Sequence, residues 1–162
     1  MMKKQILNSL TTAFFLSLVI FISCGGGNDD EPNGPTAAEE QFEKLAKSWT
    51  VTSAQADGRD VEGWTGLVIS FSGTPTAGTY SVVGDKPEGT DQVWPASGGS
   101  WTFKSEEDVN TIVRSDGVEI SVAVSEEAAD GSSTATLSFN IEDSTGRTEV
   151  VEGSWVFTLS NS

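Results

Sequence analysis

Apolar and polar residues alternate along most of the chain after Trp49, so that every second side chain is apolar over short runs. A period of two is the spacing of a β-strand that buries one face. The clearest runs occupy residues 49–54, 67–71, 101–104, 118–124, 137–141 and 151–159, and shorter ones lie near 79–83 and 110–114. The pattern predicts about eight strands.

Turn residues separate these runs. Asp-Gly pairs at 57–58, 116–117 and 130–131, and Thr145-Gly146, favour the left-handed backbone conformations that tight hairpins need. Short connections make sequence neighbours antiparallel, and an up-and-down sheet of this size closes readily into a barrel, which removes its exposed edges. The stretch 74–99, rich in proline and glycine, fits the alternation least and is expected to hold one short strand between long loops.

A different period precedes the first strand. In residues 37–46 the apolar side chains Phe42, Leu45 and Ala46 are three and four positions apart, which predicts one short amphipathic helix. The expected fold is therefore all-β: an antiparallel up-and-down barrel of about eight strands with one short N-terminal helix, in a domain covering residues 39–162.

The N-terminus has the three parts of an export signal: Lys3 and Lys4, an apolar run of about ten residues, and small residues before Cys24. About twenty apolar residues are needed to span a bilayer as a helix, so residues 1–23 are expected to be removed. Phe21-Ile22-Ser23-Cys24 resembles the lipobox of bacterial lipoproteins, which implies that Cys24 is lipidated and attaches the chain to a membrane. The alternative is an ordinary secretory signal with an incidental cysteine.

Residues 24–38 are rich in glycine, proline and charge, the composition of a flexible tether. The acidic patch 28–31 resembles the signal that sends lipoproteins of the Bacteroidota to the outer face of the outer membrane. We therefore expect a lipid-anchored protein exposed at the cell surface. The alternative is an acidic linker without a sorting role, on a protein held at the periplasmic face.

Charge and residue types exclude several classes of function. Two of the nine basic residues precede Cys24 and all 24 acidic residues follow it, so the remainder of the chain carries a net charge of −17, which argues against nucleic acid as a partner. Histidine is absent and Cys24 is the only cysteine, so no Ser-His-Asp or Cys-His catalysis and no His or Cys metal site is available. We expect no cofactor, no metal and no enzymatic activity. Two carboxylates remain an alternative for hydrolysis, with these candidates: Glu106, Glu107, Asp108, Glu126, Glu127 and Asp130.

The tryptophans fall into two groups. Trp49, Trp101 and Trp155 follow the strand alternation and are expected in the core, whereas Trp64 and Trp94 lie in irregular segments. Exposed rings can stack on sugars or line the mouth of a barrel, so Trp64, Trp94 and Tyr80 are the candidate ligand-binding residues. The role expected first for Trp64 and Trp94 is nonetheless to pack as plugs at the barrel ends.

The chain as a whole resembles the lipocalin-like-domain lipoproteins of the Bacteroidota. The residues that carry the resemblance are the segments 45–53, 93–103, 111–120 and 153–157. Lys47 stands where lipocalins proper have the glycine of a Gly-x-Trp motif. The resemblance implies a non-enzymatic outer-membrane lipoprotein whose barrel binds a small apolar or glycan ligand or a protein partner. The alternatives are an interaction scaffold with a filled barrel and no ligand, or a carboxylate-based hydrolase of surface polymers.

Overall fold

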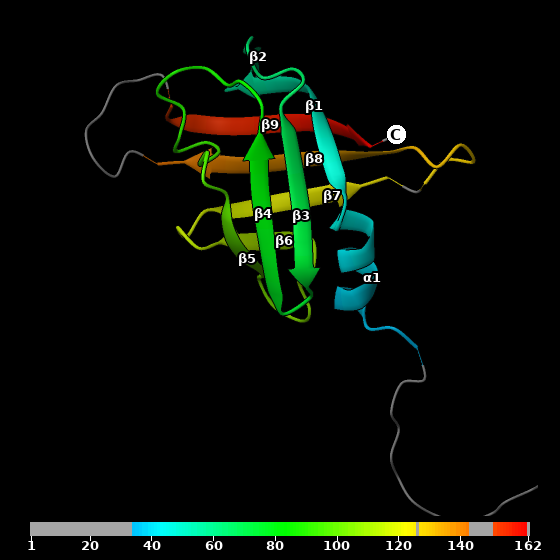
Figure 1. Cartoon of the computed structure of the whole chain (residues 1–162). Coiled ribbons are helices and arrows are strands. Elements are labelled where there is room, and N and C mark those ends of the chain that lie inside the picture. The colour runs from blue at the N-terminus through cyan, green and yellow to red at the C-terminus, as the bar shows by residue number, and fades with distance from the viewer. Residues whose placement is uncertain (1–33, 126, 143–150, 162) are drawn as a thin grey trace, which may run out of the picture. The chain divides into compact units, whose positions relative to one another are not determined.

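The structure is a computed structural model that describes residues 34–125, 127–142 and 151–161, all within the unit Pro32–Ser162 (Figure 1). The expected signal peptide, nearly all of the tether and Cys24 lie outside the described residues. The elements are α1 (Ala37–Leu45), β1 (Ser48–Ala56), β2 (Arg59–Asp60), β3 (Val68–Thr74), β4 (Ala77–Val83), β5 (Gly99–Phe103), β6 (Thr111–Arg114), β7 (Glu119–Val124), β8 (Ser133–Ile141) and β9 (Gly153–Asn161).

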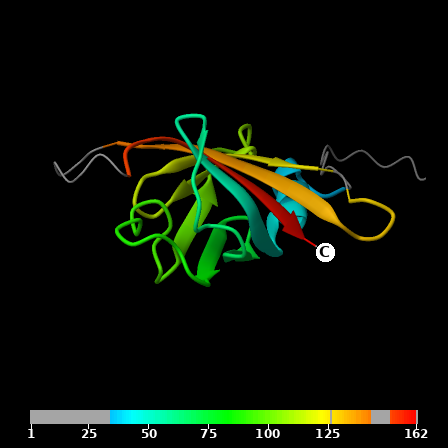
Figure 2. The ribbon, with the colours of Figure 1, turned by 90° about the horizontal axis from the view of Figure 1, so that it is seen from above.

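The strands form one closed antiparallel sheet. Consecutive strands from β3 to β9 pair with one another. Strand β1 pairs with both β3 and β9, which closes the barrel (Figures 1 and 2). A register shift between Val51 and Ser53 bends β1, so that its beginning pairs with β3 and the rest of it with β9. The two-residue strand β2 only extends the end of β1. The prediction of an eight-stranded antiparallel barrel with one short helix is confirmed.

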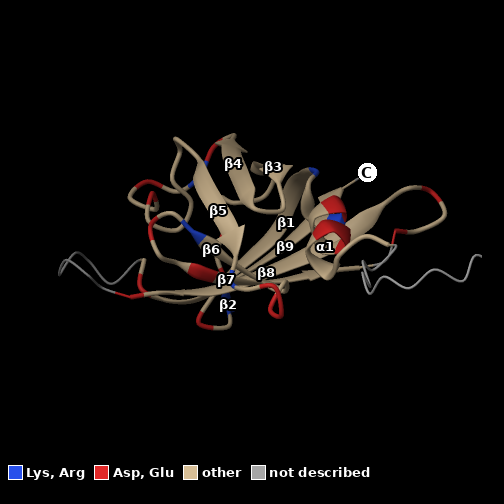
Figure 3. Ribbon diagram, turned by 90° about the horizontal axis from the view of Figure 1, so that it is seen from below, with Lys and Arg blue, Asp and Glu red and all other residues tan. Residues whose placement is uncertain are grey.

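The alternating residues of each strand point in turn to the inner and the outer face of the barrel wall. Along β8, buried residues alternate with more exposed ones over the whole strand, and β3, β7 and β9 behave in the same way for most of their length. The inward side chains form one hydrophobic core, which includes all five tryptophans. Within the eight barrel strands only Arg114 and Glu119 are charged, and Figure 3 shows the acidic residues mainly on α1 and on the connections.

Helix α1 lies beside the start of β1 and the end of β3 (Figure 1). It begins with a capping box, in which the Thr36 hydroxyl accepts a hydrogen bond from Glu39 N and the Glu39 carboxylate accepts one from Thr36 N. It is held by the fully buried Leu45 and by Phe42, whose ring stacks on Trp101 at 6.1 Å. No helix among the described residues is long and apolar enough to cross a membrane.

Two elements differ from the prediction in extent. Strand β4 begins at Ala77, ahead of the expected position 79, because Gly78 is an inward-facing strand residue rather than a break. A β-carbon on Gly78 would run into the Trp101 ring, so only glycine fits beneath that ring. Strand β8 begins at Ser133, four residues before the apolar run at Leu137. The prediction of a long irregular loop is otherwise met by residues 84–98, which hold no strand.

We name the two ends of the barrel by what closes them. The helix end carries α1, the β3–β4 turn and the β5–β6 and β7–β8 connections. The strap end carries the β6–β7 turn, the segment before β3 that includes Trp64, and residues 84–98, which we call the strap. Because neighbouring strands run in opposite directions, these two sets of connections lie at opposite ends (Figure 1).

Candidate functional site

The three candidate ligand-binding residues all lie inside the barrel. Trp64 and Trp94 are 0% exposed and Tyr80 is 5% exposed, so none of them presents a ring at the surface. Tyr80 projects inward from β4, whereas Trp64 and Trp94 reach the interior from irregular segments. The structure therefore brings these residues together as part of the core at the strap end.

Ring contacts join them into a continuous aromatic cluster. Phe157 of β9 lies between the two loop tryptophans, with its ring centroid 5.0 Å from that of Trp64 and 6.0 Å from that of Trp94, both at near-perpendicular angles. Trp94 also contacts Tyr80 at 5.7 Å and Phe139 at 5.6 Å. We call the following residues the aromatic cluster: Trp64, Tyr80, Trp94, Phe139, Trp155 and Phe157. Their rings fill this half of the barrel.

The indole N–H groups distinguish the strand tryptophans from the loop tryptophans. Trp49 Nε1 donates to Leu45 O at 2.9 Å, Trp155 Nε1 to Val151 O at 2.9 Å, and Trp101 Nε1 to Thr79 O at 3.1 Å. The Nε1 atoms of Trp64 and Trp94 are buried and have no acceptor among the described residues. A buried donor without a partner costs about 1–3 kcal/mol, and contacts with aromatic rings recover only part of that.

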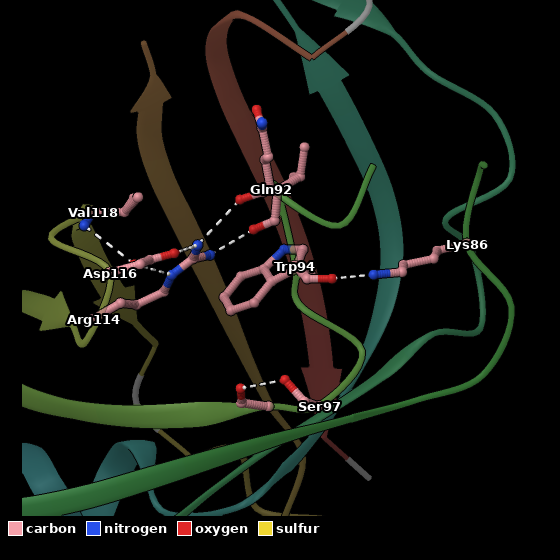
Figure 4. A network of polar contacts seen from close by, with 9 residues as sticks. Lys86, Gln92, Trp94, Ser97, Arg114, Asp116 and Val118 are labelled. Atoms are coloured by element: carbon pink, nitrogen blue, oxygen red, sulfur yellow. Dashed lines mark hydrogen bonds and ion pairs between the residues drawn. The ribbon is translucent and has the colours of Figure 1, made fainter. Parts of the chain in front are cut away.

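The strap is organised mainly by bonds within itself. Lys86 Nζ donates to Trp94 O (Figure 4). It also lies 2.6 Å from the Asp91 carboxylate, which lowers the pKa of Asp91. The backbone N–H groups of Val93 and Trp94 both donate to Thr90 O. This compact arrangement turns the side chains of Val93 and Trp94 into the barrel, where both are fully buried.

Arg114 is the residue that sequence reasoning missed. It lies at the end of β6 with 2% of its surface exposed, and it donates from Nη1 to Val93 O at 2.5 Å and from Nη2 to Gln92 O at 3.1 Å (Figure 4). Its guanidinium carbon is 5.4 Å from the centroid of the Trp94 ring, within the range of cation–π attraction. It is also 5.9 Å from the Tyr80 centroid and 6.0 Å from the Phe139 centroid.

The alternation of buried and more exposed positions in β6 could have indicated that Arg114 is buried. In β6 the buried positions are Ile112 and Arg114, so the arginine occupies an inward position that a cation takes only when it is paired. The pairing partner follows two residues later: Arg114 Nε donates to Asp116 Oδ1 at 3.0 Å, and Nη2 contacts Oδ2. The acceptors on the strap have no signature in the sequence, because they are backbone carbonyls.

The Asp116 carboxylate balances the positive charge of the buried Arg114 guanidinium. Its partial burial disfavours the ionised form, but the hydrogen bond and the positive charge of Arg114 outweigh this, so the pKa of Asp116 lies below its usual value. Val118 N donates to the same carboxylate at 3.3 Å, which fixes it within the β6–β7 turn. Burial raises the pKa of Tyr80, and the nearby Arg114 charge opposes that rise.

The carboxylates considered for hydrolysis lie elsewhere, in two connections at the helix end. Glu106, Glu107 and Asp108 belong to the β5–β6 connection, and Glu127 pairs with Lys47 at 2.7 Å. Hydrogen bonds from Ser132 lower the pKa of Asp130. Glu126 lies outside the described residues, and within the described part of the chain no three potential metal ligands of the His, Cys, Asp or Glu type gather.

Comparisons with known proteins identify no relative. No protein-family model matches the chain, no curated protein matches it, and no solved structure matches it. A proposal about function therefore depends on the packing of the barrel and on the sequence motifs described above.

Proposed function

We propose that this chain is a non-enzymatic, lipid-anchored outer-membrane protein of the lipocalin-like type, and that its barrel is an interaction scaffold which contacts a protein partner through its outer surface. The observation that carries the scaffold function is the filled interior: all five tryptophans are at most 1% exposed, and the aromatic cluster occupies the space that a ligand would need.

The location rests on the sequence. The lipobox ending at Cys24 supports lipidation, and the acidic patch 28–31 supports the outer face of the outer membrane, with the periplasmic face as the alternative. Residues 25–36 would separate the lipid from α1 by at most roughly 40 Å. A barrel on such a tether would meet partners close to the membrane, mainly through its acidic connections.

The anchor is tested by growing cells with an alkyne-bearing palmitate analogue. The unmodified chain should carry the label, and a Cys24→Ala variant should lose it, while a Ser105→Ala variant, changed at an exposed barrel position, should keep it. Equal labelling of the Cys24→Ala variant would contradict lipidation at this residue. Protease treatment of intact cells and of lysed cells then separates the surface from the periplasmic face.

A second function is favoured by the two buried indole N–H groups without acceptors. An apolar ligand carrying one acceptor atom would satisfy Trp64 or Trp94, and a ring-lined interior suits such a ligand better than a glycan. Titration with N-phenyl-1-naphthylamine separates the two functions. The scaffold proposal expects no saturable fluorescence increase. Saturable binding that weakens in a Trp94→Phe variant would favour the internal ligand instead.

A further inference from the structure

The strap has an unusual connection to the rest of the barrel. Among the described residues, every hydrogen bond that joins residues 84–98 to another part of the chain comes from the guanidinium of Arg114. The other bonds of the strap, from Lys86, Thr90, Ser97 and the backbone of residues 93, 94 and 98, stay within it. One side chain therefore supplies its whole polar attachment.

The apolar attachment of the strap is confined to a few side chains. Thr90, Val93 and Trp94 are buried, whereas the remaining strap residues are exposed or half-buried. The other members of the aromatic cluster project from β4, β8 and β9 or from the segment before β3. The strand pairings that close the barrel involve no strap residue. Removal of the strap would thus leave the wall of the barrel intact.

Both ends of the strap are glycines in the left-handed region. Gly84 has φ of 119° and Gly98 has φ of 67°, conformations that glycine adopts without strain. Such residues can absorb the backbone rotation that a hinged segment needs. Trp94 Nε1 has no acceptor within residues 34–125, 127–142 and 151–161, which adds a cost to the closed state that solvent would remove on opening.

We propose that the strap is a latched cover: it opens as a unit between Gly84 and Gly98 while the barrel stays folded, and the Arg114 guanidinium is the latch. Opening withdraws Val93 and Trp94, exposes the inner faces of Tyr80 and Phe139, and frees the guanidinium from two carbonyls. The filled barrel then has one end at which its interior becomes accessible. This device is independent of the lipid anchor and of any partner.

Thiol labelling tests the cover, because the barrel contains no cysteine of its own. In the full chain carrying Cys24→Ser, Val93→Cys places the only thiol on the buried side of the strap itself, and Ile120→Cys places it in the wall at β7. Both parent residues are fully buried, and cysteine is a small apolar replacement. Under native conditions, we expect 5,5′-dithiobis(2-nitrobenzoate) to label the strap thiol at least about tenfold faster than the wall thiol, because local opening requires less free energy than global unfolding.

The latch is tested by adding Arg114→Met to both cysteine variants. Loss of the two charge-assisted bonds to the strap should speed labelling of the strap thiol by about tenfold or more. The wall thiol, which is reached only by global unfolding, should also react faster because global unfolding loses the same bonds, but it should remain the slower of the two. Arg59→Met, at an exposed position on β2, is the matched control and should change neither rate. If Arg114→Met does not fold, Arg114→Lys, which keeps the charge but loses the planar fork, should give an intermediate increase at the strap. Equal labelling of the two thiols in the parent chain, or a strap rate that Arg114→Met leaves unchanged, would overturn the proposal.

Discussion

The two ends of the barrel are closed by different means. At the helix end, a regular element covers the interior, Leu45 and Phe42 pack inward, and Trp49 donates its indole N–H to a carbonyl four residues earlier. At the strap end, an irregular segment covers the interior, and its attachment comes from Arg114, about twenty residues later in the chain. Two buried indole donors there have no acceptor among the residues that the structure describes.

The two ends differ in where their backbone groups find hydrogen-bond partners. A helix pairs the backbone groups of its interior, and the ends of α1 find local partners in the Thr36–Glu39 capping box and the Trp49 indole, so it can cover the barrel without a distant donor. An irregular strap leaves carbonyls that need donors from elsewhere, and a guanidinium with five N–H groups can serve two carbonyls and a carboxylate at once. The strap end therefore depends on one side chain more strongly than the helix end does.

The largest effect should come from Arg114→Met. The substitution leaves the carbonyls of Gln92 and Val93 without their donor and removes the cation from its three rings, so we expect a loss of about 3 kcal/mol in the free energy of unfolding. Urea unfolding followed by tryptophan fluorescence measures the loss. Arg59→Met, which removes the exposed arginine of β2, should have no measurable effect. A similar small change for both variants would mean that the strap end does not depend on Arg114.

A matched pair of tryptophan substitutions sharpens the comparison. Trp49→Phe at the helix end and Trp64→Phe at the strap end remove the same atoms from positions that are both 0% exposed. Only Trp49 loses a hydrogen bond, and its Leu45 acceptor is then left unpaired, so Trp49→Phe should destabilise the protein by about 1 kcal/mol more than Trp64→Phe. Thermal unfolding followed by circular dichroism compares them. The opposite order would indicate that the Trp64 donor is satisfied in solution.

Sequence patterns were sufficient for the wall of the barrel and insufficient for its strap end. Alternation is a property of neighbours in the chain, so it located the strands and placed Trp49, Trp101 and Trp155 in the core. Trp94 lies in a segment without alternation, and it contacts Arg114, a residue far from it in the chain, which no local pattern encodes. Gly78 looked like an interruption of the strand pattern. Its role in the strand depends on the Trp101 ring that covers it, and that ring comes from the next strand.

A smaller effect is expected from the helix cap. Thr36→Ala removes both hydrogen bonds that the Thr36 hydroxyl makes with Glu39, at a cost of about 1 kcal/mol, whereas Thr36→Ser keeps the hydroxyl and should be nearly neutral. Urea unfolding measures the difference. The strap thiol of Val93→Cys should label at the same rate in both variants, because the cap lies at the other end. Faster labelling in Thr36→Ala would show that the two ends open together.

The smallest expected effect is on the free energy of unfolding at acidic pH. The pKa of Asp116 is lowered in the folded protein: partial burial opposes ionisation, and the Arg114 hydrogen bond and charge outweigh it. The ionised carboxylate therefore adds stability above the unfolded value of about 3.9, and this contribution is lost as pH falls through the folded pKa. Because the Asp116 side chain is 43% exposed, solvent screening keeps the contribution below about 1 kcal/mol.

The measurement is the difference in unfolding free energy between the parent chain and Asp116→Asn, which should be constant near neutral pH and shrink below about pH 4. Asp85→Asn, at an exposed strap position, serves as the control. The helix end also has a carboxylate with a lowered pKa, Glu39, whose largest cause is the hydrogen bond from the Thr36 backbone, but that group is fully exposed. A difference in unfolding free energy that does not shrink below about pH 4 would show that the Asp116 carboxylate adds no stability to the folded protein.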